Sequence, residues 1–166
     1  LENEENDPGY LGRDIDAQWN DDFHHCVHVM LTGEDQSYYG NYVRDTAGKL
    51  ARCLREGFVY QGEAPENGEG GPRGGPSGHL PPTAFVTCLQ NHDQVGNRAF
   101  GDRLTTLVER KALDAATALH LLCPQIPMIF MGEETGSKEP FLFFTDYHDG
   151  LAEAVREGRR REFRAF

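Results

Sequence analysis

The sequence predicts an α/β fold with a parallel sheet built from alternating strands and helices. Short apolar runs recur along the chain and stop abruptly at polar residues, most clearly where residues 85–89 (FVTCL) meet Gln90 to Gln94. Segments with helical spacing of apolar residues separate these runs. Such alternation is typical of βα units, whose strands pair in parallel. Polar groups at the carboxyl ends of such strands are where α/β barrels carry their chemistry.

Four segments have the character of strands. They are residues 1–3, where only the end of a strand would be present, then residues near 15–19, residues 85–89 (FVTCL) and residues 126–131 (IPMIFM). The last two are short apolar runs bounded by polar residues or glycine, as expected of buried parallel strands.

Four segments have the character of helices. Residues 21–31 begin at Asp21 and Asp22, either of which would cap the N-terminus. Residues 42–58 have apolar residues on one face and Gly57 near the end. Residues 104–123 form the clearest helix, which Pro124 ends. Residues 151–163 form a charged helix. Between the second helix and residues 85–89, residues 62–82 carry most of the glycine and proline and predict a long surface loop.

Composition restricts the function. The chain has 166 residues, about one domain, and a net charge of −11. This charge disfavours binding to nucleic acid or an anionic membrane and is compatible with a neutral ligand such as a sugar. No apolar run approaches the ~18 residues of a membrane span, and the acidic start LENEEND does not resemble a signal peptide. Because Leu1 is not a methionine and the chain stops within a helical pattern, we expect a fragment of a longer protein.

The cysteines and histidines suggest neither disulfides nor a metal. Four widely spaced cysteines without a CxxC motif fit a reduced, buried set in a cytoplasmic protein. His24 and His28 have the i,i+4 spacing of zinc ligands on a helix, but no HExxH pattern accompanies them. We therefore expect no metal, and a metal-binding module is the least favoured alternative.

Two carboxyl groups at strand ends suggest glycoside hydrolysis. Glu2 would end the first strand, where partial burial could raise its pKa for general acid catalysis. Asp93 follows the strand at residues 85–89 and could stabilise an oxocarbenium-like transition state. His92, Asn91 and Gln94 suit a hydroxyl-rich ligand, because imidazole and amide groups can bond to sugar hydroxyls.

Two further features are weaker. Trp19 is the only tryptophan, and its flat ring could stack on a pyranose, although a lone tryptophan is more often part of the core. The MGEETG turn after residues 126–131 exposes polar groups at a strand end, but its negative charge and the absence of GK[ST] disfavour phosphate binding.

Together these segments resemble the α-amylase superfamily of glycoside hydrolases. The motifs that carry the resemblance follow one another along the chain in the order found in the superfamily. A strand end with a glutamate comes first, then DAQWNDDFHH, then a strand that ends in QNHDQVGNR. PMIFMGEETG comes next and is followed by PFLFFTDY and EGRRREF. Within the superfamily these motifs are most similar to those of the malto-oligosyltrehalose trehalohydrolases. NHD alone is shared across the superfamily, whereas QNHDQVGNR combined with WNDDFHH is much more specific.

The resemblance implies the C-terminal half of a TIM (β/α)8 barrel, strands five to eight, with residues 1–166 as a partial catalytic domain. The first half of the barrel and a C-terminal β-domain would be absent. It implies Glu2 as the general acid/base, Asp93 as the transition-state stabiliser and His92 as a sugar contact. Trp19, Asp22, His24 and Arg98 fall in the matching motifs as candidate substrate-binding residues.

The implied reaction is retaining hydrolysis of the α-1,4 bond next to the terminal trehalose of malto-oligosyltrehalose, and it needs no cofactor. The aspartate nucleophile of the superfamily follows strand four, to which no part of this chain corresponds. Asp14 and Asp16 come after Glu2 and do not replace it. We therefore expect the chain alone to be inactive. The alternatives are a glycogen-branching transferase, which would make α-1,6 branches, and a remnant that binds malto-oligosaccharide without turnover.

Overall fold

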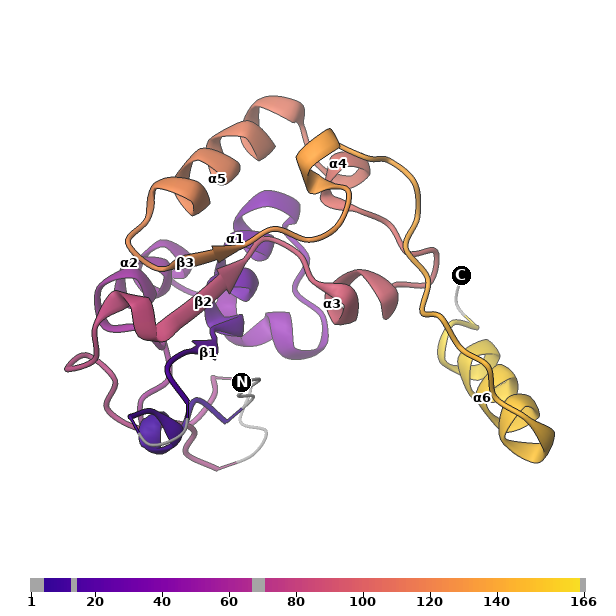
Figure 1. Ribbon diagram of the computed structural model, residues 1–166, viewed down its shortest axis with the longest axis horizontal. Helices are drawn as coiled ribbons and strands as arrows, with labels where there is room; N and C mark the ends of the chain where they lie inside the picture. Colours follow the sequence, from indigo (N-terminus) through magenta and orange to yellow (C-terminus); the bar gives the residue numbers. More distant parts are fainter. Residues whose placement is uncertain (1–4, 13–14, 67–70, 165–166) are drawn as a thin grey trace.

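The computed structural model describes residues 5–12, 15–66 and 71–164 (Figure 1). Three strands form one sheet: β1 (Gln18–Trp19), β2 (Phe85–Cys88) and β3 (Ile126–Met128). The order is β1-β2-β3 and both pairings are parallel, with Trp19 opposite Val86 and Cys88 opposite Met128. The predicted parallel sheet with intervening helices is therefore confirmed. The strand expected at residues 1–3 and the candidate acid Glu2 lie outside the described residues.

Helix α1 (Asp21–Thr32) follows β1 directly, and Asn20 rather than an aspartate occupies its N-cap position. The Asn20 N–H donates to the Val86 carbonyl at 2.8 Å. The hydrogen bonds between β1 and β2 therefore continue to Asn20, the residue directly before the helix. Asp21 and Asp22 consequently lie in the first turn. The prediction that one of them caps the helix was wrong, and Asp22 instead turns into the protein interior.

Helix α2 (Thr46–Glu56) is shorter than predicted, because a 3-10 helix, η2 (Ser37–Tyr42), and a turn precede it. Gly57 ends it with φ of +91°, as the sequence predicted. An added Cβ at Gly57 would lie 2.2 Å from the Phe85 ring, so only glycine allows β2 to approach this closely.

The helix predicted at residues 104–123 is two helices, α4 (Leu104–Leu107) and α5 (Arg110–Leu122). Val108 and Glu109 between them have extended backbones. The Leu104 N–H donates to Gln90 Oε1 at 2.7 Å. This hydrogen bond holds the first residue of α4 against the segment that follows β2. The turn at Val108 then lets α5 pack beside α1.

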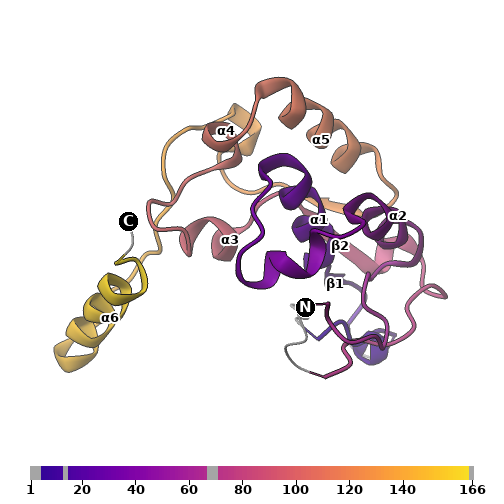
Figure 2. The same ribbon diagram turned by 180° about the vertical axis from the view of Figure 1, so that it is seen from behind.

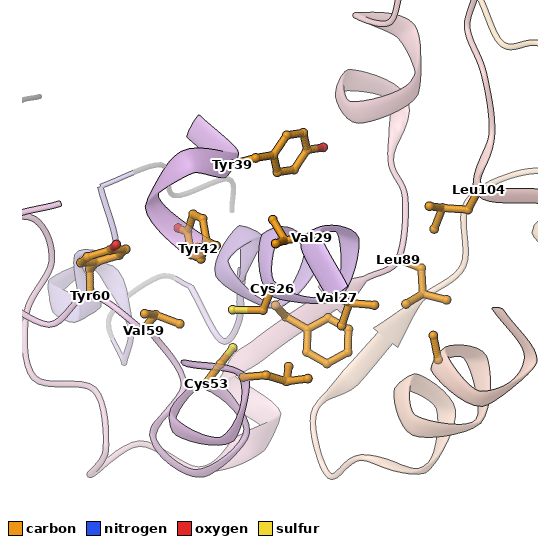
Figure 3. Packing of buried hydrophobic residues seen from close by; sticks show 13 residues of the cluster. Cys26, Val27, Val29, Tyr39, Tyr42, Cys53, Val59, Tyr60, Leu89 and Leu104 are labelled. Atoms are coloured by element: carbon orange, nitrogen blue, oxygen red, sulfur yellow. The ribbon is translucent and has the colours of Figure 1, made fainter. Parts of the chain in front are cut away.

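Helices α1, α2 and α5 share one hydrophobic core with η2 and the end of β2. Figure 3 shows Cys26 of α1 and Cys53 of α2 pointing toward one another within it. All four cysteines are free thiols, and three are buried, as the sequence predicted. The largest buried side chains of this core include Tyr42, Phe23 and Leu104.

Helix α6 (Asp149–Glu162) projects away from the rest of the molecule at the end of an extended segment, as Figures 1 and 2 show from opposite sides. It has no buried residue in its described length. Arg159 reaches back to the Gly96 carbonyl at 3.2 Å. No helix in the described ranges combines the length and apolar character needed to cross a bilayer.

The Gly/Pro-rich segment has little regular structure in its described parts before η3 (Pro82–Ala84), which agrees with the predicted loop. The loop is not merely a surface feature, however. Ser77 is fully buried and donates to the Glu56 carbonyl at 2.6 Å. Glu63 and Arg73 form an antiparallel bridge that folds the loop back on itself.

Candidate active site

A cleft of about 420 Å³ opens where the parallel strands β1 and β2 end. Its walls come from α1, η2, the Gly/Pro-rich loop and the segment after β2. Its lining includes Asp22, Tyr38, Arg73, Asn91, Asp93 and Gln94. The position agrees with the general location of active sites at the carboxyl ends of parallel strands. All six are polar, and Arg73 adds a cation, so the lining is hydrophilic.

Asn91 determines how the segment after β2 enters the cleft. Its Oδ1 accepts a hydrogen bond from the Gln94 N–H at 2.9 Å, which caps the short helix α3 (His92–Gly96). The Asn91 side chain is buried, and its Oδ1 is used for this cap. Asn91 therefore contributes by orienting the first turn of α3, which carries His92 and Asp93, more than by direct contact.

Asp93 is far more accessible than Asp22, the other predicted carboxylate among the described residues. Its side chain is 42% exposed and lines the cleft. His92 Nε2 lies 3.5 Å from Asp93 Oδ2. The His92 ring meets Trp19 edge-on at 6.1 Å and Phe143 at 6.3 Å between centroids. The structure thus brings Trp19, His92 and Asp93 together at adjacent strand ends, while their role in sugar binding stays a prediction.

Gln94 is held by two tyrosines of η2. The Tyr38 hydroxyl donates to Gln94 Oε1 at 3.0 Å, and the Tyr39 hydroxyl lies 3.4 Å from the same oxygen. The two tyrosines thus fix the orientation of the Gln94 side chain, which lines the cleft.

Asp22 is a buried structural carboxylate and only 1% exposed. Its Oδ2 accepts from Asn6 Nδ2 at 2.8 Å, from the Val59 N–H at 2.7 Å and from the Tyr60 N–H at 3.4 Å. Its Oδ1 accepts from Arg73 Nη2 at 2.9 Å and from the Tyr42 hydroxyl. Five donors satisfy the desolvated charge. Asp22 lines the cleft through this network and not as an exposed acid.

His24 lies below the cleft wall and does not line it. Its Nδ1 donates to the Leu89 carbonyl at 2.7 Å, and its Nε2 accepts from the Tyr39 hydroxyl at 3.0 Å. Burial, reinforced by His28, lowers the pKa of His24 to about 3, so the ring is neutral. With both nitrogens bonded inside the protein, His24 positions η2 relative to β2 and has no group left for substrate.

Arg98 is likewise engaged elsewhere. It forms a two-pronged ion pair with Glu34, at 2.9 Å and 2.8 Å, and His28 Nε2 bonds to the same carboxylate at 2.8 Å. Arg98 lowers the pKa of Glu34 to about 2. This cluster ties α1 to the segment after α3. The cluster does not line the cleft, so Arg98 contributes to the structure of the QNHDQVGNR segment through its ion pair with Glu34.

The turn after β3 is a separate polar contact. Glu133 accepts from Gln90 Nε2 at 2.8 Å and from the Phe130 N–H at 2.8 Å, while burial raises the pKa of its carboxyl. This pair links the ends of β2 and β3. The MGEETG turn is therefore a structural link between two strand ends. In the described ranges no cluster of three His, Cys, Asp or Glu side chains could hold a metal ion.

Sequence reasoning missed the residues that complete the cleft, above all Arg73 and Tyr38. Arg73 was the one arginine in a loop read as a surface segment, and a cation flanked by glycines was the only available signal. Tyr38 belongs to η2, which the sequence did not predict as an element. Both depend on contacts over more than 50 residues, to Asp22 and Gln94 respectively.

The curated proteins that match in sequence are named malto-oligosyltrehalose trehalohydrolase. Malto-oligosyltrehalose trehalohydrolase of Saccharolobus solfataricus is 47% identical over 152 residues, which is 91% of this chain and 27% of that protein. The proteins of the same name from Deinococcus radiodurans and Mycobacterium tuberculosis are 44% and 37% identical over 92% and 94% of the chain. The chain spans about a quarter of the length of these curated relatives. The predicted resemblance is therefore confirmed. No protein-family model matches the chain.

A solved structure supports the fold. A protein of Salmonella typhimurium described as an alpha amylase superimposes with a TM-score of 0.85 at 55% sequence identity. The match covers 90% of this chain and 26% of that one. The small parallel sheet and its helices are thus an arrangement found within an amylase-like protein.

Proposed function

We propose that this chain, similar over nine-tenths of its length to malto-oligosyltrehalose trehalohydrolases, is part of a glycoside hydrolase with that activity. The complete enzyme would cleave the α-1,4 bond next to the terminal trehalose of malto-oligosyltrehalose and release trehalose. The observation that carries this proposal is the position of Asp93. Asp93 belongs to the QNHDQVGNR segment, which follows the parallel strand β2, and it lines a cleft together with amide and hydroxyl side chains. The substrate is a neutral glucan, compatible with the net charge of −11.

The chain would supply strands five to eight of a (β/α)8 barrel, with residues 1–166 as a partial catalytic domain. β1, β2 and β3 would be strands six, seven and eight, and residues 1–3 would end strand five. Their parallel pairing in sequence order supports this proposal. Apolar side chains exposed on the β3 side, including Ile129 and Met131, also support it, because further parts of a longer protein would cover them.

In the proposed mechanism an aspartate outside this chain attacks the anomeric carbon. Glu2 protonates the departing glycosidic oxygen and then activates a water molecule to hydrolyse the covalent intermediate. Asp93 stabilises the positive charge that develops on the sugar ring. The chain alone would lack the first step and be inactive. No cofactor enters this reaction.

Substrate contacts follow from the positions of the side chains around Asp93. His92 would donate to a sugar hydroxyl, the amide of Gln94 would do the same, and Trp19 would offer a ring face. Asn91, His24, Asp22 and Arg98 would act by holding these groups in place. Reduced, buried cysteines agree with a cytoplasmic location, which we also propose.

The test is to express the complete coding sequence that contains this chain and to supply malto-oligosyltrehalose. We expect trehalose and a shortened malto-oligosaccharide as the only products. Formation of α-1,6 branches would instead identify a transferase, and binding without turnover would identify a non-catalytic protein. Either result would overturn the proposed activity.

A further inference from the structure

A buried asparagine lies shortly after the candidate general acid in the sequence. Asn6 is 2% exposed, and it lines the same cleft as Asp93. Its backbone has φ of +57°, a left-handed conformation that asparagine tolerates better than most residues with a side chain. The sequence thus places a residue suited to this conformation at the wall of the cleft, four positions after Glu2.

Hydrogen bonds hold Asn6 to three other segments of the chain. Its Nδ2 donates to Asp22 Oδ2 at 2.8 Å and to the Tyr60 carbonyl at 3.4 Å, so both amide hydrogens have an acceptor. Its backbone carbonyl accepts from the Gly75 N–H at 3.2 Å. These bonds join Asn6 to the first turn of α1, to the segment after α2 and to the Gly/Pro-rich loop. Asn6 is therefore held in one position relative to the wall of the cleft.

Asp22 is itself a rigid partner for this contact. Its carboxylate is 1% exposed and accepts four hydrogen bonds besides the one from Asn6. A carboxylate held by so many donors cannot follow a movement of Asn6 without breaking other bonds. The hydrogen bond between the two side chains therefore transmits the fixed position of α1 to the segment that contains Asn6.

The chain is also held directly after Asn6. Asp7 Oδ1 accepts from the Gly9 N–H at 2.8 Å and caps the 3-10 helix η1 (Pro8–Tyr10). An added Cβ at Gly75 would lie 3.1 Å from Pro8, so the Gly/Pro-rich loop packs closely against the start of η1. Asn6 thus stands at the beginning of a segment with defined contacts, and this segment follows the stretch that contains Glu2.

We propose that Asn6 and Asp22 are positioning residues, whose hydrogen bond holds the segment that carries the general acid Glu2 beside the cleft that contains Asp93. This inference rests on the proposed function, in which Glu2 is the acid. A span of four residues reaches at most about 14 Å, so an anchor at Asn6 limits where the Glu2 carboxyl can lie. A general acid must come within about 3 Å of the oxygen that it protonates, and a misplacement of about 1 Å can cost about a hundredfold in rate.

This role predicts a dependence on the leaving group. In the first step a bond forms between the oxygen of an aspartate outside this chain and the anomeric carbon. The bond from that carbon to the glycosidic oxygen breaks, and the proton of Glu2 moves to this oxygen. With α-maltotriosyl fluoride the carbon–fluorine bond breaks instead, and fluoride leaves without a proton from the acid. A misplaced Glu2 should therefore slow the first reaction and spare the second.

The test compares kcat/KM of the complete enzyme for malto-oligosyltrehalose and for α-maltotriosyl fluoride. Asn6→Gly allows the same φ but removes the amide. In this variant kcat/KM should fall about a hundredfold for malto-oligosyltrehalose and about threefold or less for the fluoride. Asn6→Asp also tolerates this φ but turns a second carboxylate toward Asp22, and it should show the same difference. Asp149→Gly makes a matching exchange at an exposed left-handed residue of α6 and should change neither value.

Circular dichroism of each variant separates a positioning role from a general structural one. Asn6→Gly leaves Asp22 with four donors, so this variant should keep the folded spectrum. Loss of the fold, an equal loss of rate for both substrates, or no loss for either would each overturn the positioning role. If one of these results occurs while the unsubstituted enzyme releases trehalose, only this inference fails. If the unsubstituted enzyme releases no trehalose, the proposed function fails and this inference fails with it.

Discussion

Arg73 of the Gly/Pro-rich loop donates to the buried carboxylate of Asp22 at the start of α1, at 2.9 Å and across 51 residues of sequence. This ion pair joins a segment with little regular structure to the element that follows β1. It also gives the cleft one of its walls. The shape of the candidate site therefore depends on a contact that no local sequence pattern encodes.

Asp22→Asn should destabilise the protein by about 3 kcal/mol, because the change leaves Arg73 without its buried anionic partner and turns an acceptor into a group that also donates. Urea denaturation measures this as a lower midpoint with an unchanged m-value. Asp114→Asn removes the exposed partner of Arg110 and is the control, with an expected cost of about 0.5 kcal/mol or less. Equal costs for the two variants would contradict the structural role of Asp22.

Gly57→Ala should be more damaging than Gly33→Ala, although both glycines end helices with positive φ. An alanine at Gly33 would meet nothing within 4 Å and should cost about 1 kcal/mol for backbone strain. An alanine at Gly57 would also collide with the Phe85 ring at 2.2 Å, which should raise the total to about 3 kcal/mol. Thermal unfolding of the two variants compares these values. Similar losses would mean that the close packing of β2 against Gly57 is not rigid.

Asn91→Ala should lower the unfolding free energy by about 1 kcal/mol, because the Gln94 N–H loses its capping oxygen. In the complete enzyme kcat should fall as well, since α3 positions His92 and Asp93. Asn91→Ser retains a capping oxygen and should recover most of the stability. If Asn91→Ala loses activity with unchanged stability, Asn91 contacts the substrate directly instead.

The stability of the protein should fall as the pH is lowered from about 6.5 to about 3. Burial lowers the pKa of His24 from 6.5 to about 3, so over this range the unfolded chain binds a proton at His24 that the folded chain does not. The contribution is at most about 1.4 kcal/mol per pH unit and ends below the folded pKa. His24→Asn should reduce this slope of stability against pH, and His148→Asn, at an exposed histidine, should leave it unchanged.

Much of the fold could be predicted from short-range patterns. Residues 85–89 and 126–131 have the composition of buried strands, and β2 and β3 lie within them. The spacing of apolar residues located α1 and α6, and Gly57 marked the end of α2. The break between α4 and α5 could not be predicted, because apolar spacing continues across Val108 while the hydrogen bond from Leu104 to Gln90 determines the turn.

The candidate site was predictable where its residues follow a strand directly. Asp93, His92 and Gln94 come just after β2, and Trp19 ends β1, so the parallel pairing brings them together. The residues that Arg73 and Tyr38 contact are distant in sequence, so their place in the cleft could not be read from spacing. His24 was misleading for the opposite reason: it lies in the matching motif, but α1 directs it into the interior.

The most direct test of the account is the activity of Asp93→Asn in the complete enzyme. Asp93 is partly exposed, so the substitution should leave the folding stability nearly unchanged. The rate of trehalose release should fall by about three orders of magnitude or more, because a neutral amide cannot stabilise the developing cation. Asp102→Asn, at a partly exposed aspartate that does not line the cleft, should keep its activity. A folded Asp93→Asn enzyme that releases trehalose at the unsubstituted rate would contradict the assignment of this cleft as the active site.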